Sequence, residues 1–122
     1  MKKFLILALV TFISFSLSSQ QMPVDWWKQL NGNIRFAVKA ENLTLNVIKD
    51  NLDSLYRCGY RIIEIFAPSE GGELYHGLAV KDFYKIDHSV GSEADLFNLI
   101  NACHKKGMAI IGFINPGYCS IE

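Results

Sequence analysis

Residues 73–87, ELYHGLAVKDFYKID, gather aromatic, carboxylate and imidazole side chains within one short stretch. This mixture is typical of small-ligand sites, in which an aromatic lining surrounds a few polar groups. The candidates for ligand contact are Tyr75, His76, Asp82 and Tyr84. Each also has a structural interpretation, because an aspartate can hold a loop through backbone N–H bonds, a tyrosine can pack with its hydroxyl satisfied, and a histidine can lie on the surface.

The sequence contains no recognisable phosphate-binding or nucleophile motif. The glycines of EGGELYHG, residues 70–77, lack the GxGxxG and GxxxxGK[ST] spacings that bind phosphates. The three histidines, His76, His88 and His104, accompany no recognisable nucleophile motif. His104 is expected in the last turn of a helix, where a cation complements the helix dipole.

Composition indicates a globular protein. The 122-residue chain has a formal net charge of zero, half of it is hydrophobic and 20% is charged. These values exclude neither an enzyme nor a binding protein, but they predict no basic surface for nucleic acid.

The first residues have the pattern of a secretory signal peptide. Lys2 and Lys3 precede an apolar run over residues 4–17, and small residues follow it. The run is shorter than the roughly 20 residues that a membrane-spanning helix needs, although a retained signal anchor is the alternative. We therefore predict a signal peptide over residues 1–19, cleavage after Ser18 or Ser19, and a secreted or extracytoplasmic domain over residues 20–122.

Strands and helices are expected to alternate in this domain. The sequence predicts strands over residues 33–38, 61–68 and 108–114. The first helix, residues 43–59, has an apolar face at Leu45, Ile48, Leu52 and Leu55. The second helix, residues 90–107, begins with a capping box of Ser92 and Asp95.

Two residues near these elements have alternative interpretations. Asn42 lies in an NLT sequon, so it is either a glycosylation site or, with Thr44, a helix cap. Glu64 interrupts the apolar strand of residues 61–68. It either pairs with a neighbour, faces a wet end of the sheet, or acts as a catalytic carboxylate.

The order of the elements predicts parallel strands joined by crossover helices. Both an open wound sheet and an eight-fold β/α barrel have this order. The helix-to-strand turns are very short, whereas the connection over residues 69–91 is long and aromatic. Because the loops after the strands build the site of a barrel, the lengths favour the start of a (β/α)8 barrel.

Residues 52–114 resemble the alpha-amylase family of glycoside hydrolases. The segment LDSLYRCGYRIIEIFAPSE resembles that family's first helix and second strand, HGLAVKDFYKID resembles its following loop, and VGSEADLFNLINACHKKGMAII resembles its next helix and third strand. The resemblance implies an α/β fold with about three parallel strands and two crossover helices of a TIM-type barrel. It also implies a carbohydrate partner, an α-glucan or oligosaccharide, bordered by the segment that contains Asp82.

Some positions depart from the family pattern. The family has a sugar-stacking tyrosine after the loop glycine, whereas Leu78 follows Gly77 here. The family's third strand ends in an aspartate and an Asn-His pair, whereas Phe113 holds the aspartate position. Asn115 matches the asparagine only after a shift of two residues, so it gives weak support for a calcium ion as cofactor.

The family's catalytic carboxylates come from its fourth and fifth strands, beyond the last residues of this sequence. Three interpretations follow. The chain is the amino-terminal fragment of a secreted amylase-type glycoside hydrolase and is inactive alone, or it derives from a non-catalytic amylase-like binding ectodomain, or it is an independent small secreted α/β domain.

The odd number of cysteines leaves at least one thiol unpaired or bridged to another chain. In the barrel interpretation, Cys58 and Cys103 lie towards the barrel floor and Cys119 lies on the opposite face. Cys119 is therefore expected to pair with neither.

Overall fold

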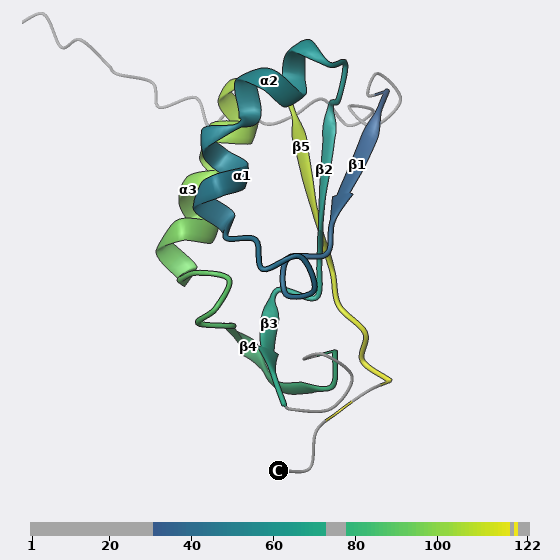
Figure 1. Cartoon of the computed structure of the whole chain (residues 1–122), viewed down its shortest axis with the longest axis vertical. Helices are drawn as coiled ribbons and strands as arrows, with labels where there is room; N and C mark the ends of the chain where they lie inside the picture. The colour runs from purple at the N-terminus through teal and green to yellow at the C-terminus, as the bar shows by residue number, and fades with distance from the viewer. Residues whose placement is uncertain (1–30, 73–77, 118, 120–122) are drawn as a thin grey trace, which may run out of the picture.

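The computed structural model describes residues 31–72, 78–117 and 119. Its centre is a parallel sheet in the order β1-β2-β5 (Figure 1). The strands are β1 (Asn33–Phe36), β2 (Ile62–Phe66) and β5 (Ala109–Phe113). The predicted parallel α/β arrangement is therefore confirmed.

All three strands are shorter than the sequence predicted. After β1, the backbone turns back at residues 37–42, where the N–H of Glu41 donates to the carbonyl of Ala37 at 2.9 Å. The turn shortens the predicted strand of residues 33–38, and its Asn42 has a φ of +51°. After β2, Ala67 has a φ of +52°, a left-handed conformation that ends the strand before Pro68.

The first predicted helix is broken into two. α1 (Leu45–Asp50) and α2 (Leu52–Arg57) meet at Asn51, whose side-chain amide donates to the Val47 carbonyl at 2.8 Å. The backbone N–H of Asn51 also donates to the Val47 carbonyl, at 3.2 Å, and the break lies at Asn51 itself, whose φ of −99° and ψ of 4° depart from helical values. The cap of α1 is Thr44, whose hydroxyl accepts from the Val47 N–H at 3.4 Å.

The second predicted helix is confirmed as α3 (Glu93–Lys105). The Asp95 N–H donates to the Ser92 hydroxyl at 3.2 Å, and the Ser92 N–H donates to the Asp95 carboxylate at 2.9 Å. This capping box satisfies N–H groups that have no partner within the helix.

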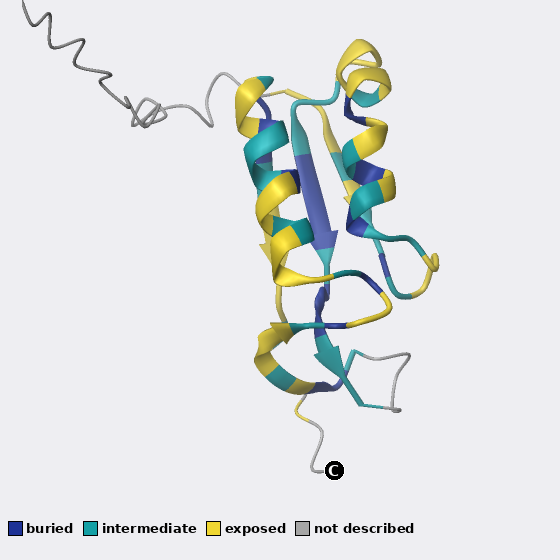
Figure 2. Ribbon diagram, turned by 90° about the vertical axis from the view of Figure 1, so that its left-hand side faces the viewer, coloured by how far each residue is buried: buried dark blue, intermediate teal, exposed yellow. Residues whose placement is uncertain are grey.

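The helices cover one face of the sheet, as Figures 1 and 2 show. The core lies between the two layers and consists of residues from both: Val38, Leu45, Ile48, Leu52, Ile63, Ile65, Val90, Leu99, Cys103 and Met108. Ile63 and Ile65 of the central strand are almost fully buried there. Because side chains alternate along a strand, Ile62, Glu64 and Phe66 point to the other face, on which no helix packs among the described residues.

The long connection over residues 69–91 contains a hairpin that the sequence analysis did not predict. β3 (Ser69–Gly71) pairs antiparallel with β4 (Val80–Ile86), with irregular register between them. The hairpin lies beyond the carboxyl ends of the parallel strands, which is where the sequence placed the segment (Figure 1). The Asp87 N–H donates to the carbonyl of Pro68 at 2.9 Å, which extends the pairing of the hairpin by one residue beyond Ser69 and Ile86.

The predicted signal peptide, residues 1–19, lies outside the described residues. Within residues 31–72 and 78–117, no helix is long and apolar enough to cross a bilayer.

Candidate functional site

The carboxyl ends of β1, β2 and β5, together with the β3–β4 hairpin, form the edge at which a β/α protein builds its site. Two of the predicted contact residues, Tyr75 and His76, lie outside the described residues. The other two, Asp82 and Tyr84, lie on β4.

Asp82 is held within its own strand. One carboxylate oxygen accepts from the Tyr84 N–H at 2.8 Å, and the other lies 3.3 Å from the Lys85 ammonium. The Tyr84 hydrogen bond and the Lys85 contacts keep the pKa of Asp82 below its usual value. The Tyr84 residue is 92% exposed. Asp82 thus has the structural role considered above, and sugar contact by either residue stays a prediction.

Asn115 alone supplies too few oxygen ligands for a calcium site. Its side-chain oxygen accepts from the Gly117 N–H at 3.1 Å, within one turn. Calcium takes about six to eight oxygen ligands, mostly from carboxylates and carbonyls. In the described part of the chain, no three histidine, cysteine, aspartate or glutamate side chains cluster to hold a metal. These residues do not fit a calcium ion, and no step of the proposed function uses one.

Asp87 is the polar centre of this edge, and sequence reasoning gave it no role. It is 8% exposed. One carboxylate oxygen accepts from the Ser89 hydroxyl at 2.6 Å and the Ser89 N–H at 3.0 Å. The other accepts from the Gly71 N–H at 3.3 Å and lies 3.2 Å from the Lys39 ammonium.

These donors decide the charge of Asp87. Burial raises its pKa, but the hydrogen bonds from Ser89, Gly71 and Lys39 outweigh burial and lower the pKa to about 2. Lys39 also donates to the Ser69 carbonyl. The carboxylate therefore joins the turn after β1, the β3–β4 hairpin and the turn before α3. Its position two residues before Ser89 was the sequence signal for this role, because an aspartate side chain readily accepts from the backbone two residues on.

Glu64 is also paired rather than free. It is 7% exposed, and one oxygen lies 2.8 Å from Nε of Arg35 on the neighbouring strand. The other oxygen accepts from the Asn33 side-chain amide at 3.3 Å. The interpretation of Glu64 as a strand carboxylate with a neighbouring partner is confirmed.

Two rings lie beside this ion pair. Phe66 and Phe113 occupy paired positions at the ends of β2 and β5, and their ring centroids are 4.7 Å apart in a stacked arrangement. The Arg35 guanidinium carbon lies 5.5 Å from the Phe66 centroid and 5.9 Å from the Phe113 centroid. The face of the sheet away from the helices thus carries one cation held by two rings and a carboxylate.

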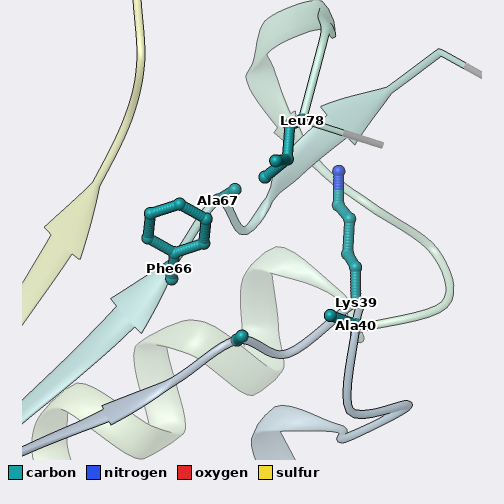
Figure 3. A pocket seen from close by; sticks show the side chains of 6 residues that line it. Lys39, Ala40, Phe66, Ala67 and Leu78 are labelled. Carbon is teal, nitrogen blue, oxygen red and sulfur yellow. The ribbon is translucent and has the colours of Figure 1, made fainter. Parts of the chain in front are cut away.

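A small cavity opens next to Phe66 (Figure 3). Its volume is about 100 Å³, and its lining is apolar except for one lysine: Ala37, Lys39, Ala40, Phe66, Ala67 and Leu78. Leu78 points towards Ala67 and Phe66 in Figure 3, at the position where the amylase-family resemblance places a stacking tyrosine. Ligand pockets usually measure about 300–1,000 Å³, so this cavity is at most one part of a larger site.

Comparison with known proteins finds similarity to larger sugar-active enzymes over part of this chain. No protein-family profile matches the sequence. The periplasmic alpha-amylase of Escherichia coli (strain K12) is 31% identical over a region that covers 55% of this chain and 12% of that protein. The chain therefore spans about an eighth of the length of this relative.

Solved structures of larger enzymes contain a region with a similar fold. An isomaltulose synthase of Erwinia rhapontici NX5, solved with sucrose, matches with a TM-score of 0.64 and 25% identity, over 71% of this chain and 17% of that chain. The alpha-amylase of Geobacillus thermoleovorans, complexed with acarbose, matches with a TM-score of 0.64 and 19% identity, over 75% of this chain and 25% of that one. Each match covers a small part of a much larger enzyme.

Proposed function

From the resemblance to the alpha-amylase family of glycoside hydrolases, which the comparisons confirm over part of the chain, we propose that this chain is the amino-terminal part of a secreted carbohydrate-active protein. It forms the first three strands of the barrel and one rim of a sugar cleft. The observation that carries the proposal is the position of the β3–β4 hairpin beyond the carboxyl ends of the parallel sheet.

The rim, which is the β3–β4 hairpin, is held in a fixed position by Asp87. Asp87 fixes both strands of the hairpin through Gly71 and its own position after β4, and it connects them to Lys39 in the turn after β1. A rigid rim suits sugar binding, because a sugar loses less affinity when the groups that contact it are already ordered.

Hydrolysis requires residues beyond those described. Retaining cleavage uses two carboxyl groups about 5 Å apart, one as nucleophile and one as acid/base. At this edge, Asp82 accepts a backbone N–H, Asp87 has four donors, and Glu64 is paired with Arg35. Since each carboxylate is committed to a structural contact, we propose that the chain has no turnover alone and that a longer parent cleaves α-glucosidic bonds.

Export is the remaining part of the proposal. The amino-terminal pattern of Lys2, Lys3 and an apolar run supports a cleaved signal, and the Escherichia coli relative is described as periplasmic. We propose an extracytoplasmic location for the chain. Mass spectrometry of the secreted product should give a new amino terminus after Ser18 or Ser19.

A binding ectodomain without catalysis is a second candidate. Two residues favour it: Leu78 lines an apolar cavity where the family has a stacking tyrosine, and Phe113 stacks on Phe66 where the family has an aspartate. A protein with these replacements lacks the family's sugar-stacking tyrosine and the structural or calcium-linked aspartate at the end of its third strand.

The test starts from the reading frame after Glu122. The longest in-frame product and residues 20–122 are each purified and assayed for release of reducing sugar from maltotriose and for maltotriose binding. The proposal expects turnover only in the longer product. Binding without turnover in the longer product would support the ectodomain. A monomeric, cooperatively unfolding 20–122 product that binds no sugar would instead support an independent domain.

A further inference from the structure

Arg35 on the helix-free face of the sheet is held in one orientation but keeps part of its hydrogen-bonding capacity. Its Nε lies 2.8 Å from the Glu64 carboxylate, and its guanidinium lies over the Phe66–Phe113 pair. Its terminal nitrogens make no hydrogen bond with the residues that the structure describes. The Arg35 side chain is 58% exposed, whereas the Glu64 side chain is 9% exposed.

A second arginine shows what a purely structural contact looks like in this chain. Arg61 also lies over a ring, 3.6 Å from the Tyr56 centroid. However, its Nη1 donates to the carbonyls of Tyr56 at 2.8 Å and Tyr60 at 2.9 Å. Arg61 therefore closes the end of α2, while Arg35 presents its terminal donors to the open face.

Arg35 also lies near the proposed cleft. It pairs in register with Glu64, two residues before the end of β2, and its guanidinium reaches towards the last residues of β2 and β5. In a β/α barrel, the face opposite the helices is the interior, and its carboxyl-end layer is the floor of the site. The Arg35 guanidinium therefore lies close to that floor.

We propose that Arg35 donates hydrogen bonds to sugar hydroxyls at the floor of the cleft, with Glu64, Phe66 and Phe113 as positioning residues. The inference rests on the proposed carbohydrate function. The chemistry favours a neutral polyol over an anion, because Glu64 already compensates the charge of Arg35. The planar guanidinium offers adjacent donors whose spacing suits neighbouring hydroxyls.

The experiment is an NMR titration of the purified chain with maltotriose, following the side-chain N–H signals of the arginines. The Arg35 signal should shift and saturate with the same dissociation constant as the rest of the chain. Arg35→Leu should weaken binding by about tenfold or more, because a hydrogen bond from a charged donor is lost. Arg35→Lys, which lacks the planar guanidinium, should recover only part of the affinity.

Arg61→Leu is the matched control, because it removes the other ring-stacked arginine and should leave the dissociation constant unchanged. Circular dichroism checks the folding of each variant. If Arg35→Leu does not fold, the shift of the Arg35 signal in the wild-type chain tests the contact with maltotriose. Saturable shifts elsewhere with an unmoved Arg35 signal would overturn this inference and leave the proposed function standing. Absence of maltotriose shifts at every residue of a monomeric chain that unfolds cooperatively would overturn both.

Discussion

Replacement of Asp87 by asparagine tests whether one buried carboxylate fixes the rim of the site. The structure gives this group four donors: two from Ser89, one from Gly71 and the ammonium of Lys39. An asparagine retains one acceptor oxygen, so its NH2 group must face either the Ser89 donors or the Gly71 and Lys39 donors. In either orientation, buried hydrogen bonds are lost, and Lys39 loses its contact with the Asp87 carboxylate.

The magnitude follows from the pKa of Asp87. A fall from 3.8 to about 2 corresponds to about 2 kcal/mol of folding stability at neutral pH. Removal of one member of a buried ion pair costs about 3–5 kcal/mol when the other charge stays buried. We expect Asp87→Asn to lower the free energy of unfolding by about 2–4 kcal/mol at pH 7, as measured by urea unfolding with circular dichroism.

The pH dependence gives a second readout. Because the pKa of Asp87 is lower in the folded than in the unfolded chain, its stabilisation is complete above about pH 4 and is lost as the pH falls towards about 2. The difference in stability between wild type and Asp87→Asn should therefore shrink over that interval. Other acids titrate there too, but they do so in both proteins and cancel in the difference.

Asp50→Asn is the control, since the Asp50 side chain is 72% exposed and should change stability by less than about 0.5 kcal/mol. If Asp87→Asn is as mild as this control, or if the difference from wild type does not depend on pH, the carboxylate does not fix the rim.

Three further experiments test the fold around the site. Because Cys103 is buried and its thiol pKa is about 11, a thiol reagent should modify the exposed Cys58 and Cys119 in the native chain and Cys103 only after unfolding. Ser92→Ala removes the cap of α3 and should cost about 1 kcal/mol in urea unfolding. Gly32→Ala places a Cβ 2.6 Å from a backbone oxygen at φ +80°, so its melting temperature should fall further than that of Gly107→Ala, where φ is +68° but the space is open.

The parallel sheet could be predicted because its signals are local. The apolar run of β2, the heptad-like spacing before it and the Ser92–Asp95 capping box each depend on residues close in sequence. The break at Asn51 was missed because the apolar periodicity continues through it, while the break is a change in the backbone angles of one residue. The β3–β4 hairpin was missed because its first strand has three residues and its register is irregular.

The candidate site was harder to predict than the fold. Asp87 and Lys39 are 48 positions apart in the sequence, and only the tertiary structure brings them within 3.2 Å. Nothing in the neighbourhood of Lys39 marks it as buried. Arg35 and Glu64 pose the same difficulty, because their pairing depends on the register of two parallel strands. Sequence reasoning selected Asp82 and Tyr84 from their residue types. The structure adds that Asp82 accepts a hydrogen bond within the hairpin and that Tyr84 is exposed, and sugar contact by either stays a prediction.

Three carboxylates near the candidate site have structural contacts. Asp82 holds a strand, Asp87 holds the rim and Glu64 orients Arg35. An acid that accepts several donors stays ionised far below neutral pH, as Asp87 does, and such a group is a poor proton donor at neutral pH. The donors around these three carboxylates therefore suit them to holding the hairpin and Arg35 in place.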